Sequence, residues 1–353
     1  MAFSRRDPAI TVTIDDIAFG GDGVGRWQHE VTFVPFTIEG ETVQATVVER
    51  RRRFQRAALV RVLKPSPHRA DPPCPYFGRC GGCAYQHMAY PHQLEVKRAQ
   101  VAQALRRIGQ FREVEVAPAV PSPQPFGYRN RITVHAEDGK LGFYELRSHT
   151  LLDIVRCPLA SEAVNAKLAE LRRRGLPPGA HRTLREGAGT TFEQVNDGVA
   201  RLLLEYVGRH LCGDSLVDAY CGSGFFAHAF APRLRMVAGI EWSEPAVASA
   251  RRNACANETY HLGDVAALLG EVLRATKPDS LLLDPPAEGL GPEVIEQTLA
   301  QPPARIVYVS CNPATLARDL SRLAPGYRLL EVQPFDMFPQ TAEVEAAAVL
   351  GKR

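Results

Sequence analysis

The stretch Val307-Tyr308-Val309-Ser310-Cys311-Asn312-Pro313 predicts the strand around which the rest of the chain is organised. Residues 305–309 form a short apolar run typical of a buried strand, and the polar residues that follow end it. Ligands of open α/β sheets bind outside the carboxyl ends of the strands, so Cys311 would lie where a ligand is expected. A thiol held by a rigid strand end is a candidate nucleophile. Taken alone, the stretch favours the alternative that Cys311 is a small buried side chain, as most free cysteines are.

The C-terminal half alternates predicted strands and helices, which is the signature of a doubly wound α/β sheet. Residues 215–226 are typical of a strand, a glycine turn and the start of a helix. The glycines of that turn let the backbone approach a ligand closely. The next three predicted strands end at Glu241, Asp264 and Asp284. A carboxylate at the tip of the second strand can bind both hydroxyls of a ribose.

The glycine turn also indicates which cofactor to expect. The dinucleotide fingerprint GxGxxG is absent, because Phe226 and Ala227 stand where its last glycine would be. A single GxG, followed on the fourth strand by Asp284-Pro285-Pro286, fits S-adenosylmethionine better than NAD. The methionine sulfonium has no pyrophosphate that would need a longer glycine run.

Composition limits the classes of protein to consider. The 353 residues, 45% hydrophobic and 23% charged, suit a soluble globular protein of two or three domains. There is no unbroken apolar run of membrane-spanning length, and residues 1–7 lack the apolar core of a secretory signal. Eight cysteines without a signal favour a reducing, cytoplasmic location and roles in metal binding or catalysis. The net charge is only +3, so a nucleic-acid surface must come from local clustering.

Residues 1–64 predict a small β-barrel. A glycine-rich turn is expected over 19–25, and strands are expected over 10–14, 31–35, 42–49 and 57–63. Between the last two strands, residues 50–56 carry five arginines around one phenylalanine, which suits phosphate contact and base stacking. The alternative is a solvated loop without a partner. The segment resembles the TRAM domain, a small barrel found on RNA-modifying enzymes, and this favours RNA binding.

A proline-rich boundary near residues 65–75 leads into a second predicted domain, residues 65–185. Cys74, Cys80 and Cys83 are separated by five and two residues, which is metal-ligand spacing. Cys157 is the one further cysteine outside the catalytic half, and we interpret the four as a [4Fe–4S] site. Structural zinc also accepts four thiolates, and the spacing alone leaves the two interpretations nearly even.

The rest of this domain is predicted to mix helices with a sheet. Residues 128–145 suggest a hairpin that turns at Asp138-Gly139, and residues 160–174 suggest a helix that ends at Gly175. An amphipathic helix is expected over 91–112. Its apolar side would be formed by Leu94, Val96, Val101, Leu105 and Ile108, and its basic side by Lys97, Arg98, Arg106 and Arg107. The side chains of Arg129, Arg131 and Arg147 either face a polyanion or form the solvent-facing side of the sheet. We interpret His135 and His149 as structural residues.

Four motifs together resemble the RNA uridine C5-methyltransferase family, S-adenosylmethionine enzymes that form 5-methyluridine in ribosomal or transfer RNA. The motifs are Asp-Ala-Tyr-Cys-Gly-Ser-Gly at 218–224, Asp-Pro-Pro at 284–286, Ser-Cys-Asn-Pro at 310–313 and Phe-Pro-Gln-Thr-Ala-Glu-Val-Glu at 338–345. The resemblance covers nearly the whole chain. It implies an α/β protein with an N-terminal TRAM barrel, a central α+β domain with a metal cluster, and a Rossmann-like class I methyltransferase domain over 186–353.

The resemblance also implies the roles of individual residues. Cys311 would be the nucleophile and Glu345 the base, which is what the chemistry needs: one activated thiol and one carboxylate. Taken alone, Glu345 would be a surface carboxylate on an edge strand. The resemblance implies that S-adenosylmethionine is contacted by Gln194, Tyr220, Glu241 and Asp284. It also implies that a [4Fe–4S] cluster is held by Cys74, Cys80, Cys83 and Cys157.

Neighbouring chemistries and an inactive relative are the alternatives. Amino-group methyltransferases place an aromatic ring after Asp-Pro-Pro, and RNA cytosine C5 enzymes carry Pro-Cys there, whereas this chain has Pro285-Pro286-Ala287. Relatives usually have arginine at position 287, histidine at 343 and often asparagine at 225, where this chain has Ala287, Glu343 and Phe225. Because of these departures, the alternative function is that of a catalytically inactive RNA-binding or chaperone protein. If Glu343 lies close to Glu345, its charge would raise the pKa of that carboxyl.

The barrel favours 23S ribosomal RNA as the substrate, with transfer RNA as the alternative. Neither a membrane nor an obligate protein partner is indicated by the sequence.

Overall fold

The computed structural model describes residues 9–187 and 194–353, so the N-terminal residues considered above for a signal lie outside the described ranges. The chain divides into two compact units. One comprises residues up to Val96 together with Gln124–Glu186 and Phe338–Ala342, and the other comprises Lys97–Pro123, Gly187–Met337 and Glu343–Arg353. The division of the sequence into three domains at residues 64 and 185 stays a prediction. In the described ranges, no helix combines the length and the apolarity needed to cross a membrane.

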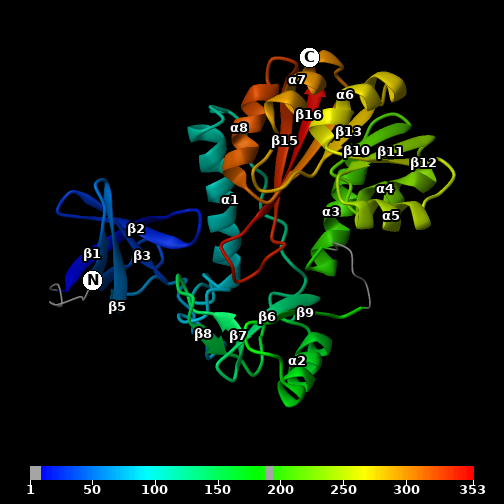
Figure 1. The fold of residues 1–353 in the computed structure, drawn as a ribbon. Helices are drawn as coiled ribbons and strands as arrows, with labels where there is room; N and C mark the ends of the chain where they lie inside the picture. The colour runs from blue at the N-terminus through cyan, green and yellow to red at the C-terminus, as the bar shows by residue number, and fades with distance from the viewer. Residues whose placement is uncertain (1–8, 188–193) are drawn as a thin grey trace. The chain divides into compact units, whose positions relative to one another are not determined.

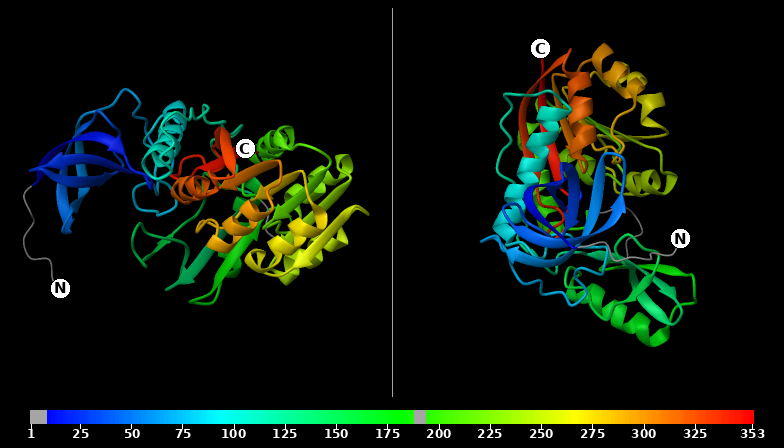
Figure 2. Two further views of the ribbon diagram at one scale, coloured as in Figure 1. Left: turned by 90° about the horizontal axis from the view of Figure 1, so that it is seen from above. Right: turned by 90° about the vertical axis from the view of Figure 1, so that its left-hand side faces the viewer.

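The predicted N-terminal barrel is confirmed and closes in the order β1-β2-β3-β5-β4, the blue part of Figures 1 and 2. Its alternating side chains give an apolar interior, since Ile10, Val12 and Ile14 of β1 are buried and the residues between them are exposed. The strands are β1 Ile10–Ile17, β2 Asp22–Trp27, β3 Glu30–Pro35, β4 Thr42–Arg50 and β5 Phe54–Lys64.

The prediction missed one strand of this barrel. The glycine-rich segment 19–25 was expected to be a turn throughout, but the turn ends at Gly21 and β2 begins at Asp22. The reason is close backbone approach: a Cβ on Gly23 would clash with Thr37, and one on Gly25 would clash with the carbonyl of Thr13. Glycine in this strand therefore permits tight packing rather than ending the strand.

The same unit contains a four-stranded antiparallel sheet in the order β8-β7-β6-β9. The predicted hairpin is confirmed, because β6 and β7 pair across Asp138 and Gly139, whose φ values are 48° and 74°. Helix α2, Glu162–Arg174, covers one face of the sheet (Figure 1); Ser161 caps its start, and it ends at Gly175, which has φ 77°. The strands are β6 Arg131–Glu137, β7 Lys140–Tyr144, β8 Leu151–Asp153 and β9 His181–Arg185.

Helix α1, Tyr90–Arg107, is shorter than predicted and ends two residues before Gly109. Its two sides also differ from the prediction. Ile108, expected on the apolar side, lies beyond the helix and is 46% exposed, whereas Lys97, expected on the basic side, is fully buried. Lys97 is tolerated there because its ammonium pairs with the carboxylate of Asp336.

The second unit has the predicted doubly wound architecture, a seven-stranded sheet in the order β12-β11-β10-β13-β14-β16-β15. Six strands run in the same direction, and β16 alone in this sheet is antiparallel to them, including both of its neighbours. The strands are β10 Ser215–Ala219, β11 Met236–Glu241, β12 Glu258–Leu262, β13 Ser280–Leu283, β14 Arg305–Ser310, β15 Tyr327–Phe335 and β16 Glu345–Lys352.

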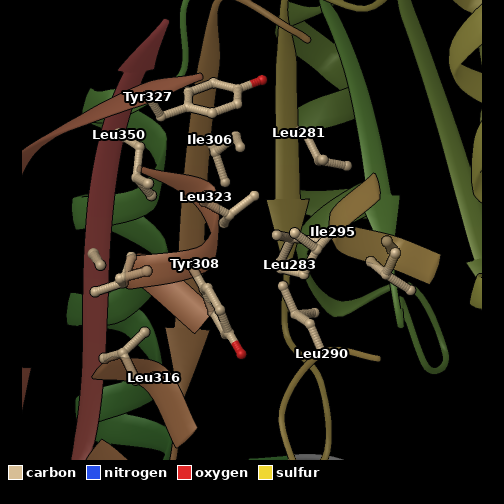
Figure 3. Packing of buried hydrophobic residues seen from close by; sticks show 14 of the residues in the cluster. Leu281, Leu283, Leu290, Ile295, Ile306, Tyr308, Leu316, Leu323, Tyr327 and Leu350 are labelled. Carbon is tan, nitrogen blue, oxygen red and sulfur yellow. The ribbon is translucent and has the colours of Figure 1, made fainter. Parts of the chain in front are cut away.

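Helices cover both faces of this sheet. The larger core packs α1, α6, α7 and α8 against one face, and Figure 3 shows Leu281, Ile306 and Tyr308 of the sheet meeting Leu316 and Leu323. Since the connections before and after β12 use opposite faces, the order of the strands reverses between β10 and β13. The helices are α3 Asp197–His210, α4 Phe225–Phe230 with the short turn η1 Ala231–Arg233, α5 Glu244–Arg252, α6 Val265–Thr276, α7 Pro292–Ala300 and α8 Pro313–Leu323.

Candidate active site

Cys311 lies at the carboxyl end of β14, where the sequence predicted it. The next residue, Asn312, caps helix α8 by accepting a hydrogen bond from the backbone N–H of Ala314 at 3.0 Å. The hydroxyl of Ser310 donates to the carbonyl of Asn312 and accepts from its N–H, both at 3.2 Å. These bonds fix the strand-to-helix turn, so the half-buried thiol of Cys311 has a defined position.

The strand register brings Glu345 next to this thiol. In the antiparallel pair of β14 and β16, Ser310 is opposite Ala346. Cys311 directly follows Ser310 and Glu345 directly precedes Ala346, so both residues lie at the same end of this strand pair, where the charge of Glu345 acts on the thiol. Glu345 is 5% exposed, so it is not the surface carboxylate that the sequence alone suggested. The strand is interior as well, because β16 lies between β14 and β15.

Burial and three nearby carboxyl groups raise the pKa of the Cys311 thiol. Burial raises the pKa of this thiol to about 11, and the carboxylates of Glu345, Asp284 and Glu343 add to that increase. Burial also raises the pKa of Glu345 well above its usual range, with Asp284 and Glu343 contributing. The sequence anticipated this effect of Glu343 on Glu345. Burial and the close spacing of these acids therefore favour the neutral forms of Glu345 and of the Cys311 thiol in the free site.

Asp284 follows the end of β13, and burial raises the pKa of its carboxyl to about 7. The loop after Asp284 is held from helix α8. Asn312 and Thr315 donate to the carbonyl of Ala287 at 3.1 and 3.0 Å, and Arg318 donates to the carbonyl of Glu288 at 2.8 Å. The loop is anchored through its backbone carbonyl groups at Ala287 and Glu288.

The glycine turn after β10 is tied to the tip of β11. Glu241, the last residue of β11, accepts hydrogen bonds from the N–H of Gly222 at 3.0 Å and of Ser243 at 2.8 Å. Tyr220 begins the turn at φ 67°, and Gly224 ends it at φ 91°. This turn lies at the point where the order of the strands reverses, which is where ligands of doubly wound sheets bind.

The structure places Gln194 in the segment before α3, half-buried, just after the residues outside the described range. Its role in cofactor binding stays a prediction, as do those of Tyr220, Glu241 and Asp284.

A buried network beneath the glycine turn was not predicted from the sequence. Nδ1 of His228 lies 2.6 Å from the carboxylate of Glu258, and the hydroxyl of Tyr260 donates to the same oxygen at 2.5 Å. A Cβ on Gly224 would approach Nε2 of His228 to 2.5 Å and the hydroxyl of Tyr260 to 2.9 Å. The network thus limits position 224 to glycine, and it depends on three elements that only the fold brings together.

The four cysteines of the central region line one cavity of about 410 Å³ in the first unit, so Cys157 joins the three closely spaced thiols. Burial raises the pKa of Cys83 to about 12, and charge on Cys157 and Cys80 would raise it further, so the thiols lie within electrostatic reach of one another. Gln86 donates to the sulfur of Cys83 at 3.2 Å. Within the described ranges, no three His, Cys, Asp or Glu side chains are grouped to hold a single metal ion.

The fold and the site define a class of protein. A doubly wound sheet with a single GxG turn, a carboxylate at the tip of its second strand and polar residues at the strand reversal is the architecture of a Rossmann-like methyltransferase. Comparison with known families supports this class and makes it specific. The model of the tRNA (Uracil-5-)-methyltransferase family matches residues 181–276 and 264–353, and the model of the TRAM domain matches residues 9–60.

Full-length relatives are also similar to this chain. An uncharacterized RNA methyltransferase of Gloeobacter violaceus is 32% identical, with 97% of this chain and 96% of the relative covered. One of Synechocystis is 31% identical, covering 98% and 96%. The chain belongs to the tRNA (uracil-5-)-methyltransferase family, and it carries a TRAM domain.

One solved structure is similar over the same extent. The tRNA (uracil-54, C5)-methyltransferase of Pyrococcus abyssi, in complex with S-adenosyl-L-homocysteine, has a TM-score of 0.76 at 27% identity. The similarity covers 97% of this chain and 100% of that one. S-adenosylmethionine is therefore the cofactor supported for this family, and RNA the supported class of substrate.

Proposed function

We propose that this protein methylates C5 of uridine in RNA, with Cys311 as nucleophile and Glu345 as base. The observation that supports the proposal most directly is the strand register, which brings Cys311 and the buried Glu345 to the same end of the β14–β16 pair. Burying Glu345 near two other carboxyl groups is unfavourable for folding. Such an arrangement is typical of a site that uses the groups chemically.

The proposed reaction assigns one bond change to each group. C5 of uracil is a poor nucleophile until Cys311, having lost its thiol proton to solvent, adds as a thiolate to C6, which places electron density on C5. When bound, S-adenosylmethionine supplies the methyl group, on a sulfonium whose positive charge opposes that of the carboxylates. Glu345 then takes the proton from C5, and the C6–S bond breaks as the double bond re-forms.

The function is tested by measuring the product. The purified protein is incubated with S-adenosylmethionine and with 23S ribosomal RNA or transfer RNA from cells that lack the gene, and the nucleosides are identified by mass spectrometry. We expect 5-methyluridine in one of the two RNAs. The barrel favours ribosomal RNA, and the similarity to the Pyrococcus abyssi enzyme favours transfer RNA. A methylated cytidine or adenosine, or no product with either RNA, would contradict the proposal.

Replacing Glu345 with glutamine should separate the two halves of the reaction. Addition and methyl transfer need no base, whereas release does, so we expect a methylated adduct to accumulate on the protein while turnover falls about 10²–10⁴-fold. Denaturing gels with labelled RNA report the adduct, and nucleoside analysis reports turnover. Glu331→Gln on the neighbouring strand β15 is the matched control and should behave like the parent. Normal turnover by Glu345→Gln would rule Glu345 out as the base.

We also propose that Cys74, Cys80, Cys83 and Cys157 hold a [4Fe–4S] cluster. The observation that supports this assignment is that all four thiols line one cavity, which gives the set of thiolate ligands that a [4Fe–4S] cluster needs and that structural zinc also accepts. The cluster would staple Cys157 to the segment that carries the other three cysteines.

Purification without air tests this assignment. We expect brown protein with about four irons per chain, the number of cysteines on the cavity. Cys157→Ser should lose most of the iron and the visible absorbance, whereas Cys255→Ser, which changes an exposed cysteine, should keep both. Colourless protein that contains zinc would contradict the cluster.

A further inference from the structure

The face of the central sheet that α2 leaves open carries a ladder of like residues. Strands β6 and β9 pair so that three outward residues of β6 meet residues of their own kind, Arg131 with Arg185, Thr133 with Thr183 and His135 with His181. The residues between them point the other way, since Ile132, Val134 and Leu184 are buried in the core beneath. We call these three pairs the β6–β9 ladder.

Aromatic rings gather at one end of the ladder. The ring of His135 lies 4.6 Å from that of Tyr144 on β7 and 5.9 Å from that of His181, and Tyr144 also lies 6.2 Å from His149. Tyr144 is 39% exposed, and His181 and His149 are exposed as well. A surface cluster of flat rings presents faces on which other rings can stack.

The other end of the ladder is basic. Arg131 and Arg185 are direct cross-strand partners. Guanidinium groups bind phosphate through charge-assisted hydrogen bonds. The histidine pair lies four residue steps along the strand from the arginine pair, about 14 Å at ~3.4 Å per step, so both ends lie within the reach of a few nucleotides.

The chemistry of the ladder favours a nucleic acid over a protein partner. The fully buried centres of protein interfaces are apolar, and neither β6 nor β9 turns an aliphatic side chain outward on this face. Guanidinium groups beside stacking rings are instead the combination that binds unpaired nucleic acid. In a duplex the bases are already stacked on one another, so this face suits single-stranded RNA.

We propose that the β6–β9 ladder binds unpaired nucleotides of the RNA substrate, with phosphates at the Arg131–Arg185 end and bases stacked on the rings of His135, His181 and Tyr144. This inference rests on the proposed function for its RNA. It assigns to the central sheet a contact separate from the barrel and from the site around Cys311, and it defines the substrate as RNA that is single-stranded next to the target.

Fluorescence anisotropy with the full chain tests the ladder. The probe is a fluorescein-labelled single-stranded RNA longer than the ~16 nucleotides that small barrels cover, and a blunt RNA duplex of the same length is the comparison. His181→Ala and Tyr144→Ala should each weaken binding of the single strand about tenfold, the loss of one stacked base. His181→Phe and Tyr144→Phe should remain within about twofold of the parent because they keep a ring. Duplex binding should not change.

Two results would overturn the proposal that the ladder binds RNA. Alanine variants that bind the single strand like the parent would show that the face does not contact RNA, and phenylalanine variants as weak as the alanine variants would exclude stacking. Tyr144 also lines the cysteine cavity, whereas His181 does not. If the Tyr144 variants fold poorly, the comparison of His181→Ala with His181→Phe tests the proposal. Failure of the proposed function is distinct, since it appears as missing 5-methyluridine in protein that still binds RNA.

Discussion

Replacing Cys311 with alanine should abolish covalent capture of RNA that contains 5-fluorouridine and reduce 5-methyluridine formation to background. The fluorine on C5 cannot leave as a proton, so the parent should remain bonded to C6 after methyl transfer and migrate as a protein–RNA band on a denaturing gel. Alanine has no sulfur to add to C6. The loss should be on the order of 10⁴–10⁶-fold, as for other essential nucleophiles.

The control for this prediction is another cysteine of the same unit. Cys255 is exposed and lies outside the strand ends that form the site, so Cys255→Ala should trap RNA like the parent. An unchanged yield of 5-methyluridine from Cys311→Ala would mean that the methyl transfer proceeds without this thiol. Binding of labelled RNA by the same variant would show whether its fold is intact.

The second large effect concerns stability. Changing Lys97 to methionine should destabilise the protein by about 3–5 kcal/mol, because it leaves Asp336 as an uncompensated buried charge. The ammonium of Lys97 lies 2.5 Å from the carboxylate of Asp336, and both side chains are fully buried. Methionine keeps most of the volume of lysine, so the loss measures charge pairing rather than a cavity.

Urea denaturation followed by circular dichroism measures this effect as a shift of the transition to lower urea. Arg107→Met changes an exposed cation on the same helix and should shift stability by less than about 0.5 kcal/mol. The double variant Lys97→Met with Asp336→Leu removes both charges and should recover most of the loss. A single variant as stable as the parent would mean that Asp336 finds another partner or water.

Much of the fold follows from local patterns. The strands of the doubly wound sheet are short apolar runs that end in glycine, proline or carboxylates, and the hairpin at Asp138-Gly139 needs two residues with positive φ. These features depend on neighbours in sequence, so they can be predicted one segment at a time. The strand in the glycine-rich part of the barrel escaped prediction because its glycines serve contacts with distant residues, Thr37 and Thr13.

For the site, the sequence by itself determined the kinds of group present and one of their positions. A strand followed by Ser-Cys-Asn-Pro places Cys311 at a sheet edge, and the cysteine spacing indicates a metal site. Only the tertiary structure decided which groups meet. Cys311 and Glu345 are neighbours because β16 runs antiparallel to β14, and the β6–β9 ladder exists because two distant strands pair in one register. A one-residue shift of register would turn either set of side chains to the opposite face, and register depends on the packing of the whole sheet rather than on any single segment.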